Sequence, residues 1–289
     1  MMTRYYKFAG IKFAVTMPQE MVCENEYRLA LFRVEETEPD LRIIFAQKDQ
    51  LSSPQGALMA KQPGMHCYVD NDRSIRYIGA YSDDWETASI RVEYNGSSAR
   101  AEVKNRHGQA RVPVKYVLEC MAAEHMIAGK QGFLFHCSYI DRGGKAILFT
   151  APSETGKSTQ ADLWHMLRGA EIINGDRAAV RLEKGVLLAE GIPFAGSSAY
   201  CKNKSLPIAA IVYLAQASST TICKLRGYQA FSKIWEGVSV NIWDKTDMEQ
   251  VSNVVQRAAT ELPIFQLSCT PDESAITALE EALRKLVNP

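Results

Sequence analysis

The chain contains 289 residues, 46% of them hydrophobic and 23% charged, which is typical of a globular protein. Its 33 basic and 33 acidic residues balance. This balance argues against partners such as nucleic acid or an anionic membrane, because both need a surplus of Lys and Arg. The longest apolar run, residues 208–215, is far too short to cross a bilayer. The N-terminus lacks a signal-peptide core and no two cysteines form a CxxC pair, so we expect a cytoplasmic protein with reduced thiols.

Residues 1–110 predict a β-rich N-terminal domain without a visible catalytic constellation. Short aromatic and β-branched runs alternate with turn signals about every ten residues, which is typical of an antiparallel sheet or sandwich. The strands we expect cover residues 5–17 with a turn at 9–10, 29–34, 41–46, 65–69, 75–80, 88–94 and 99–104. The polar stretch 105–108 marks the expected boundary of this domain.

Residues 111–289 predict an α/β domain, because strands and helices alternate along this part of the chain. The expected helices cover residues 114–128, 157–167, 229–241, 247–260 and 272–286. The expected strands cover residues 133–140, 146–150, 171–174, 180–182, 186–190, 208–215 and 265–269. The fold class is therefore mixed α+β and α/β, with a β-rich domain followed by an α/β domain.

Residues 151–159 carry the most informative motif of the chain. They follow an apolar strand and open a helix, which is where a phosphate loop of consensus GxxxxGK[ST] belongs. In such a loop backbone N–H groups hold phosphate, a lysine reaches the β- and γ-phosphates, and a hydroxyl binds Mg²⁺. Gly156, Lys157 and Ser158 match the consensus. The predicted nucleotide-binding residues are Ser153, Glu154, Thr155, Gly156, Lys157, Ser158 and Thr159.

Two positions in this loop depart from the consensus. Ala151 replaces the first glycine, and Glu154 places a carboxylate where many phosphate loops carry glycine. A functional loop must turn Glu154 toward solvent, because an inward carboxylate would repel phosphate. A degenerate loop that no longer binds nucleotide is the alternative.

A second motif, residues 174–177, ends an apolar strand one helix and one strand after Lys157. A phosphate-loop enzyme needs a carboxylate at such a strand end to hold Mg²⁺ or to accept a proton, and Asp176 fits that need. Arg177 either clamps a phosphoryl group or pairs with a surface acid. His136 lies in the apolar strand 133–140, where a lone histidine is more often a core residue than a functional one.

Together these three elements make residues 115–289 resemble the kinase domain of HPr kinase/phosphorylase, and more broadly the phosphoenolpyruvate carboxykinase-like P-loop proteins. The resemblance implies ATP and Mg²⁺ on the loop, with Lys157 holding phosphates and Ser158 and Asp176 as metal ligands. It also implies catalytic roles for Asp176, His136, Lys157 and Arg177, with Asp176 activating an acceptor hydroxyl. HPr kinase carries two adjacent aspartates, and Gly175 stands here in place of the first.

These observations favour an ATP-dependent kinase that phosphorylates a hydroxyl of a peptide, a protein serine or a small metabolite. The N-terminal domain would then recognise the acceptor or pack as a lid. The alternative is a non-catalytic or regulatory nucleotide-binding protein, and a carboxykinase-like lyase is a lesser one. Neither the acceptor nor the choice among ATP, GTP and pyrophosphate follows from the sequence, and the resemblance makes a homo-oligomer worth testing.

Overall fold

The computed structural model describes residues 1–24, 26–71, 73–80, 84–105 and 111–287. The chain divides into two compact units, Met1–Met126 and Ile127–Pro289. The expected boundary near residue 110 lies outside the described residues. Helix α2 (Val114–Cys120) contacts strands of the first unit, so the segment expected to open the second domain is grouped with the first.

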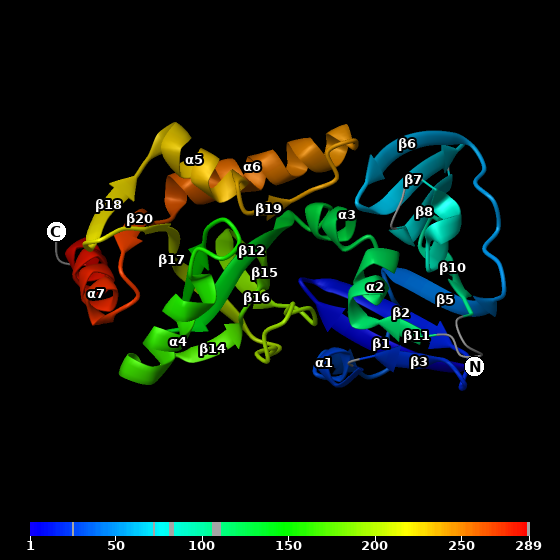
Figure 1. Ribbon diagram of the computed structural model, residues 1–289, viewed down its shortest axis with the longest axis horizontal. Coiled ribbons are helices and arrows are strands. Elements are labelled where there is room, and N and C mark those ends of the chain that lie inside the picture. Colours follow the sequence, from blue (N-terminus) through cyan, green and yellow to red (C-terminus); the bar gives the residue numbers. More distant parts are fainter. Residues whose placement is uncertain (25, 72, 81–83, 106–110, 288–289) are drawn as a thin grey trace. The chain divides into compact units, whose positions relative to one another are not determined.

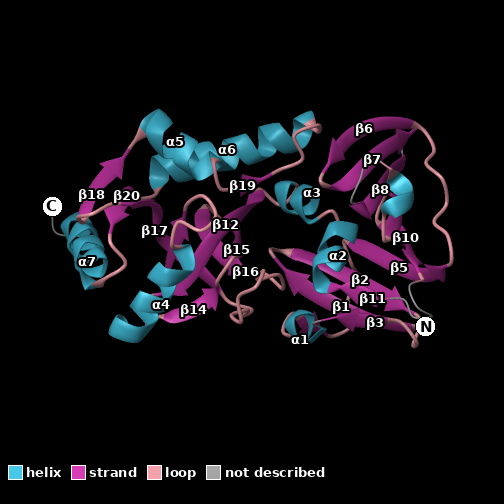
Figure 2. Cartoon of the chain, in the orientation of Figure 1, coloured by secondary structure: helices cyan, strands magenta, loops and turns pink. Residues whose placement is uncertain are grey.

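The first unit is dominated by a nine-stranded sheet, which includes the strands labelled β1, β2, β5 to β8 and β10 in Figure 2. Its strands follow the order β4-β1-β2-β5-β10-β9-β8-β7-β6. Their bounds are β1 Met2–Phe8, β2 Ile11–Met17, β4 Arg33–Val34, β5 Leu41–Lys48, β6 Ala57–Gln62, β7 Gly64–Asp70, β8 Arg73–Ala80, β9 Ile90–Asn95 and β10 Ser98–Lys104. Strand β5 pairs in parallel with both β2 and β10. The sheet is therefore mixed, and these two parallel pairings depart from the expected antiparallel sheet or sandwich.

The remaining elements of the first unit are short. They are β3 (Val22–Glu24), α1 (Glu26–Ala30), η1 (Trp85–Thr87), β11 (Arg111–Pro113) and α2, and α3 (Ala123–Ala128) leads into the second unit. Residues 29–30 end α1 instead of starting a strand, and β6 was not expected. The helix expected over 114–128 is split into α2 and α3, because Ala122 takes a left-handed φ of 52° that interrupts the helix.

The second unit is built on a second nine-stranded sheet system. Its strands are β12 Gly132–Asp141, β13 Ala146–Thr150, β14 Glu171–Asn174, β15 Arg177–Glu183, β16 Val186–Gly191, β17 Ser205–Gln216, β18 Thr221–Leu225, β19 Val238–Ser239 and β20 Ile264–Cys269. Its helices are α4 Lys157–Arg168, α5 Gly227–Trp235, α6 Lys245–Glu261 and α7 Glu273–Val287. Strand β18 was missed, and α5 ends earlier than expected because the chain continues into β19.

Strand β12 joins two layers of this sheet system. Residues 132–136 pair with β15, whereas residues 137–141 pair with β13. Helices α4 and α7 cover one core, which contains the fully buried Trp164 and Leu279. Helices α5 and α6 cover the other, which contains Ile234 and Val255 (Figure 1). The architecture is thus mixed α/β and rich in β-structure, with two large sheets.

Strands β13, β17 and β20 run parallel to one another, so their carboxyl ends meet at one edge. In open α/β sheets this is the edge where ligands bind. None of the seven cysteines, all within the described residues, forms a disulfide. Within the described residues, no helix is both long enough and apolar enough to span a membrane.

Candidate functional site

The predicted phosphate loop connects β13 to α4. All five residues of β13 are buried, so the strand fixes the start of the loop. Gly156 caps α4 with φ 111°, a backbone conformation that other residues rarely adopt. The Lys157 side chain is 7% exposed, and its Nζ donates to the carbonyl oxygens of Ala151 and Pro152, each at 3.1 Å. Burial lowers the pKa of Lys157. The ammonium therefore lies inside the loop, held by carbonyl groups.

The side chains of the remaining loop residues do not fill the interior of the loop, which is lined by backbone groups. Ser153 and Thr159 are exposed, and Thr155 is half-buried. Glu154 is exposed as well, as a phosphate-binding loop requires, and its φ is 64°. The left-handed backbone at this position explains why glycine is favoured there, because only glycine adopts it without a steric cost.

Under the nucleotide-binding prediction made from the sequence, replacing Glu154 by Gly should tighten Mg-ATP binding by about two- to fivefold, because one exposed negative charge leaves the predicted phosphate loop. Glu154→Gln removes the charge and keeps the side chain, so it should give most of the gain. Calorimetric titration at low and high salt checks both variants, and the gain should shrink as salt rises. Weaker binding by Glu154→Gln would show that the carboxylate assists the ligand.

The end of β14 is organised by Asn174, which is fully buried. Its Oδ1 accepts the backbone N–H groups of Asp176 and Arg177, at 3.0 and 3.1 Å. Its Nδ2 donates to the carbonyl oxygens of Ile192 and Phe194, at 3.1 and 3.0 Å. One amide therefore fixes both the turn that carries Asp176 and the segment after β16.

Close contacts at two glycines bring that turn against the loop 195–200. A Cβ added at Gly175 would lie 2.1 Å from Ser198 Oγ, so Ser198 occupies the space of a side chain there. A Cβ added at Gly196, whose φ is 52°, would lie 2.9 Å from the carboxyl carbon of Asp176. On the other side, Ser158 Oγ donates to the carbonyl oxygen of Gly175 at 3.4 Å. The predicted phosphate loop and the Asp176 turn are therefore direct neighbours.

His136, Asp176 and Arg177 form a half-exposed cluster. His136 Nε2 lies 3.7 Å from Asp176 Oδ1, and Arg177 Nε lies 3.5 Å from Asp176 Oδ2. The Arg177 guanidinium also lies over the Phe194 ring, 5.3 Å from its centroid. Burial, with the positive charge of Lys157, lowers the pKa of His136 despite the opposing effect of Asp176. The lowered pKa favours the neutral imidazole, which can accept or relay a proton.

This lowered pKa predicts a pH dependence of stability in the protein free of metal and nucleotide. His136 binds its proton less readily in the folded than in the unfolded state, whose pKa is near 6.5. Its stabilising contribution is complete above pH 6.5 and is lost as the pH falls below that value. Urea unfolding between pH 5 and 7 should show a smaller loss of stability for His136→Gln than for the wild type. An equal loss in both proteins would contradict the assignment.

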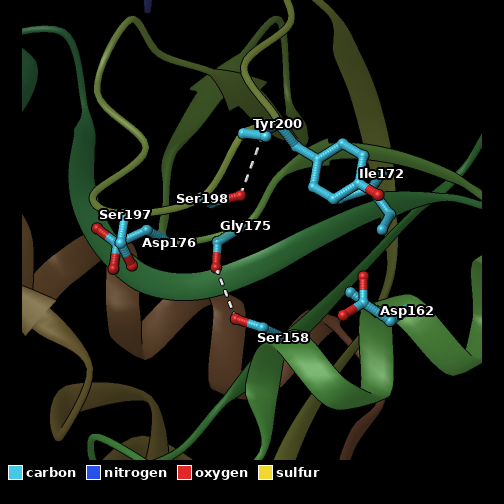
Figure 3. Close-up of a pocket in the computed structure, with 10 residues that line it drawn as sticks. Ser158, Asp162, Ile172, Gly175, Asp176, Ser197, Ser198 and Tyr200 are labelled. Carbon is cyan, nitrogen blue, oxygen red and sulfur yellow. Dashed lines mark hydrogen bonds between the residues drawn. The ribbon is translucent and has the colours of Figure 1, made fainter.

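A cavity of about 270 Å³ opens beside Ser158 and Asp176 (Figure 3). Residues from α4, from the end of β14 and from the loop after β16 line it. They are Ser158, Ala161, Asp162, Ile172, Gly175, Asp176, Ser197, Ser198, Ala199 and Tyr200. Of the predicted site residues, only Ser158 and Asp176 reach this cavity. Lys157 faces the loop, and His136 and Arg177 flank Asp176 from outside the cavity.

Sequence analysis did not single out Asp162, Asn174, Ser198 or Tyr200 as functional residues. Asp162 follows Ser158 by four residues, which places both on one helical face, so its position could have been found from spacing. Asn174 and Gly175 contact residues about twenty positions further along the chain, Ser198 among them, and no local pattern predicts such contacts.

The strand–loop–helix segment and the mixed sheets define a mixed α/β protein that is rich in β-structure. Among solved structures, the chain is similar to the HPr(Ser) kinase/phosphatase from Coxiella burnetii, with 10% sequence identity and a TM-score of 0.35. The match covers 53% of this chain and 97% of that chain. It indicates a distant structural relationship. No protein-family model matches the chain, and no curated protein sequence does.

Proposed function

We propose that this protein is an ATP-dependent kinase that transfers a γ-phosphoryl group to a hydroxyl group. The observation that carries the proposal is the meeting of three parts at one place. The loop that holds Lys157 adjoins the Asp176 turn through the hydrogen bond from Ser158 to Gly175, and Ser158 and Asp176 line one cavity. Phosphoryl transfer depends mainly on positioning and electrostatic stabilisation, and this arrangement offers both.

Ser158 and Asp176 offer hydroxyl and carboxylate oxygens, which are the donors that Mg²⁺ prefers. When bound, Mg²⁺ would neutralise charge on the transferring phosphoryl group. Lys157 would exchange its two carbonyl partners for phosphate oxygens. The ion pair of Asp176 with Arg177, and the imidazole of His136 at 3.7 Å from Asp176 Oδ1, would keep the carboxylate oriented toward the cavity.

The transfer step follows from these positions. The acceptor oxygen forms a bond to the γ-phosphorus while the bond from that phosphorus to the β,γ-bridging oxygen breaks. The bridging electron pair remains on ADP, and Asp176 takes the hydroxyl proton. His136, neutral and adjacent to Asp176, is a positioning residue for the carboxylate and a relay for its proton.

The first test is a calorimetric titration of Mg-ATP into the wild type and Lys157→Ala. Losing the charged hydrogen bonds of Lys157 should weaken binding by about 10- to 100-fold. Lys145→Ala, which removes an exposed lysine from the turn between β12 and β13, should bind as the wild type does. A wild-type protein that binds no Mg-ATP would overturn the proposal.

A non-catalytic nucleotide-binding protein is the second candidate. One observation favours it, because Ser198 fills the space beside Gly175 where the kinase family carries its first aspartate. This candidate predicts Mg-ATP binding without transfer to any hydroxyl, so nucleotide binding alone does not separate the two functions.

A further inference from the structure

The cavity beside Ser158 has a distinctive polar lining. Its charged groups are the carboxylates of Asp162 and Asp176, and its other polar lining groups include three serine hydroxyls. Within the described residues, no basic side chain lines it. Lys202 and Lys204 follow shortly after Tyr200, but they pair with Glu171 and Asp141 instead. The cavity therefore presents negative charge and hydroxyl groups to an occupant.

Asp162 is the carboxylate of this cavity to which the proposed function assigns no role. It lies one helical turn after Ser158 on α4 and is half-buried. Within the described residues it makes no hydrogen bond or ion pair, whereas the nearby Glu171 and Asp141 are both paired with lysines. The oxygens of Asp162 therefore have no partner within the described residues and are available to a cation bound in the cavity.

The two carboxylates lie at opposite ends of the cavity in Figure 3. Asp176 and Ser197 are at one end, and Ser158 lies between the two carboxylates (Figure 3). Asp162 is at the other end, near Ile172 and the ring of Tyr200 (Figure 3). A carboxylate with an aromatic ring is a favourable environment for an organic cation, through charge pairing and cation–π attraction.

We propose that this cavity binds the phosphoryl acceptor, a small hydroxyl compound that also carries an ammonium group. The hydroxyl would face Asp176, and the ammonium group would lie between Asp162 and Tyr200. The acceptor role rests on the proposed kinase function. No residue of the loop 152–157 lines the cavity, so it is distinct from the space that the loop encloses. Its volume of about 270 Å³ suits a small metabolite or one side chain.

Three probes of similar size and different charge test this specificity. Serinol carries an ammonium group and two hydroxyls, glycerol is neutral, and glycerate is anionic. Ligand-observed NMR would measure their dissociation constants in the full chain, with and without Mg²⁺ and a non-hydrolysable ATP analogue. We expect serinol to bind about tenfold more tightly than glycerol, and glycerate to bind least, because the cavity is acidic.

Variants then test whether Asp162 causes the preference for serinol over glycerol. Asp162→Asn keeps the shape and removes the charge, so it should lower serinol affinity about tenfold and leave glycerol affinity unchanged. Tyr200→Leu should weaken serinol binding by a smaller factor. Glu249→Gln, which neutralises an exposed acid on α6, is the matched control and should preserve the preference.

The outcomes separate this proposal from the kinase function. Equal affinity for serinol and glycerol, binding of none of the probes, or an unchanged preference in Asp162→Asn would overturn the cavity assignment even if Mg-ATP binds. A serinol preference in a protein that fails to bind Mg-ATP would overturn the acceptor role and the kinase function, while the cation specificity would stand.

Discussion

With Asp176 replaced by Asn, we expect phosphoryl transfer to slow by about 10²- to 10⁴-fold, the range that a positioned proton acceptor contributes. Mg-ATP should still bind, because Lys157 and the backbone of the loop remain in place. Asn has the shape of Asp, so the cavity wall should be preserved. The amide can neither take the acceptor proton nor offer a charged oxygen to Mg²⁺.

The measurement is the rate of ADP formation with Mg-ATP and serinol, and with water alone as acceptor. Each variant is paired with a calorimetric titration of Mg-ATP, so that a loss of binding is not mistaken for a loss of transfer. Glu249→Gln provides the control for removing one carboxylate elsewhere in the same unit.

Two results would redirect the assignment of Asp176. A variant with the full wild-type rate would show that another group accepts the proton. A wild-type protein that binds Mg-ATP and transfers nothing, even to water, would favour the non-catalytic alternative. The second result would agree with the position of Ser198, which occupies the space that a side chain at position 175 would need.

The parts of this site that the sequence predicts are the local ones. Residues 146–150 read as a buried strand, Gly156 as the residue before a helix, and the Asp176 motif as the end of the next strand. All three expectations are confirmed by β13, by the cap of α4 and by the turn after β14. In the structure, the hydrogen bond from Ser158 to Gly175 makes the loop and the turn neighbours.

Contacts between residues far apart in the chain were not predicted, because the pattern of side chains along a segment does not show which other segment it contacts. The alternation in β5 is the same whether its neighbours run parallel or antiparallel, so the parallel pairings with β2 and β10 were not predicted. In the same way, the sequence NGDR reads as a turn without showing that Asn174 also binds Ile192 and Phe194. The cavity wall depends on that longer-range contact.

Replacing Asn174 by Ala is therefore expected to have the largest effect on stability, a loss of about 2–4 kcal/mol in the free energy of unfolding. Asn174 makes four hydrogen bonds from a fully buried position. Alanine would leave two carbonyl oxygens and two N–H groups without these partners. Urea unfolding followed by circular dichroism measures the loss. Asn253→Ala on the exposed face of α6 should change stability by less than about 0.5 kcal/mol.

Asn174→Asp distinguishes the two functions of this amide. An aspartate can still accept the N–H groups of Asp176 and Arg177, but it cannot donate to Ile192 and Phe194. The Asp176 turn should stay in place while the loop 195–200 loosens, so serinol affinity should fall more than Mg-ATP affinity. Equal losses of both affinities would show that the turn and the loop move as one unit. Asn174 would then contribute as much to Mg-ATP affinity as to serinol affinity.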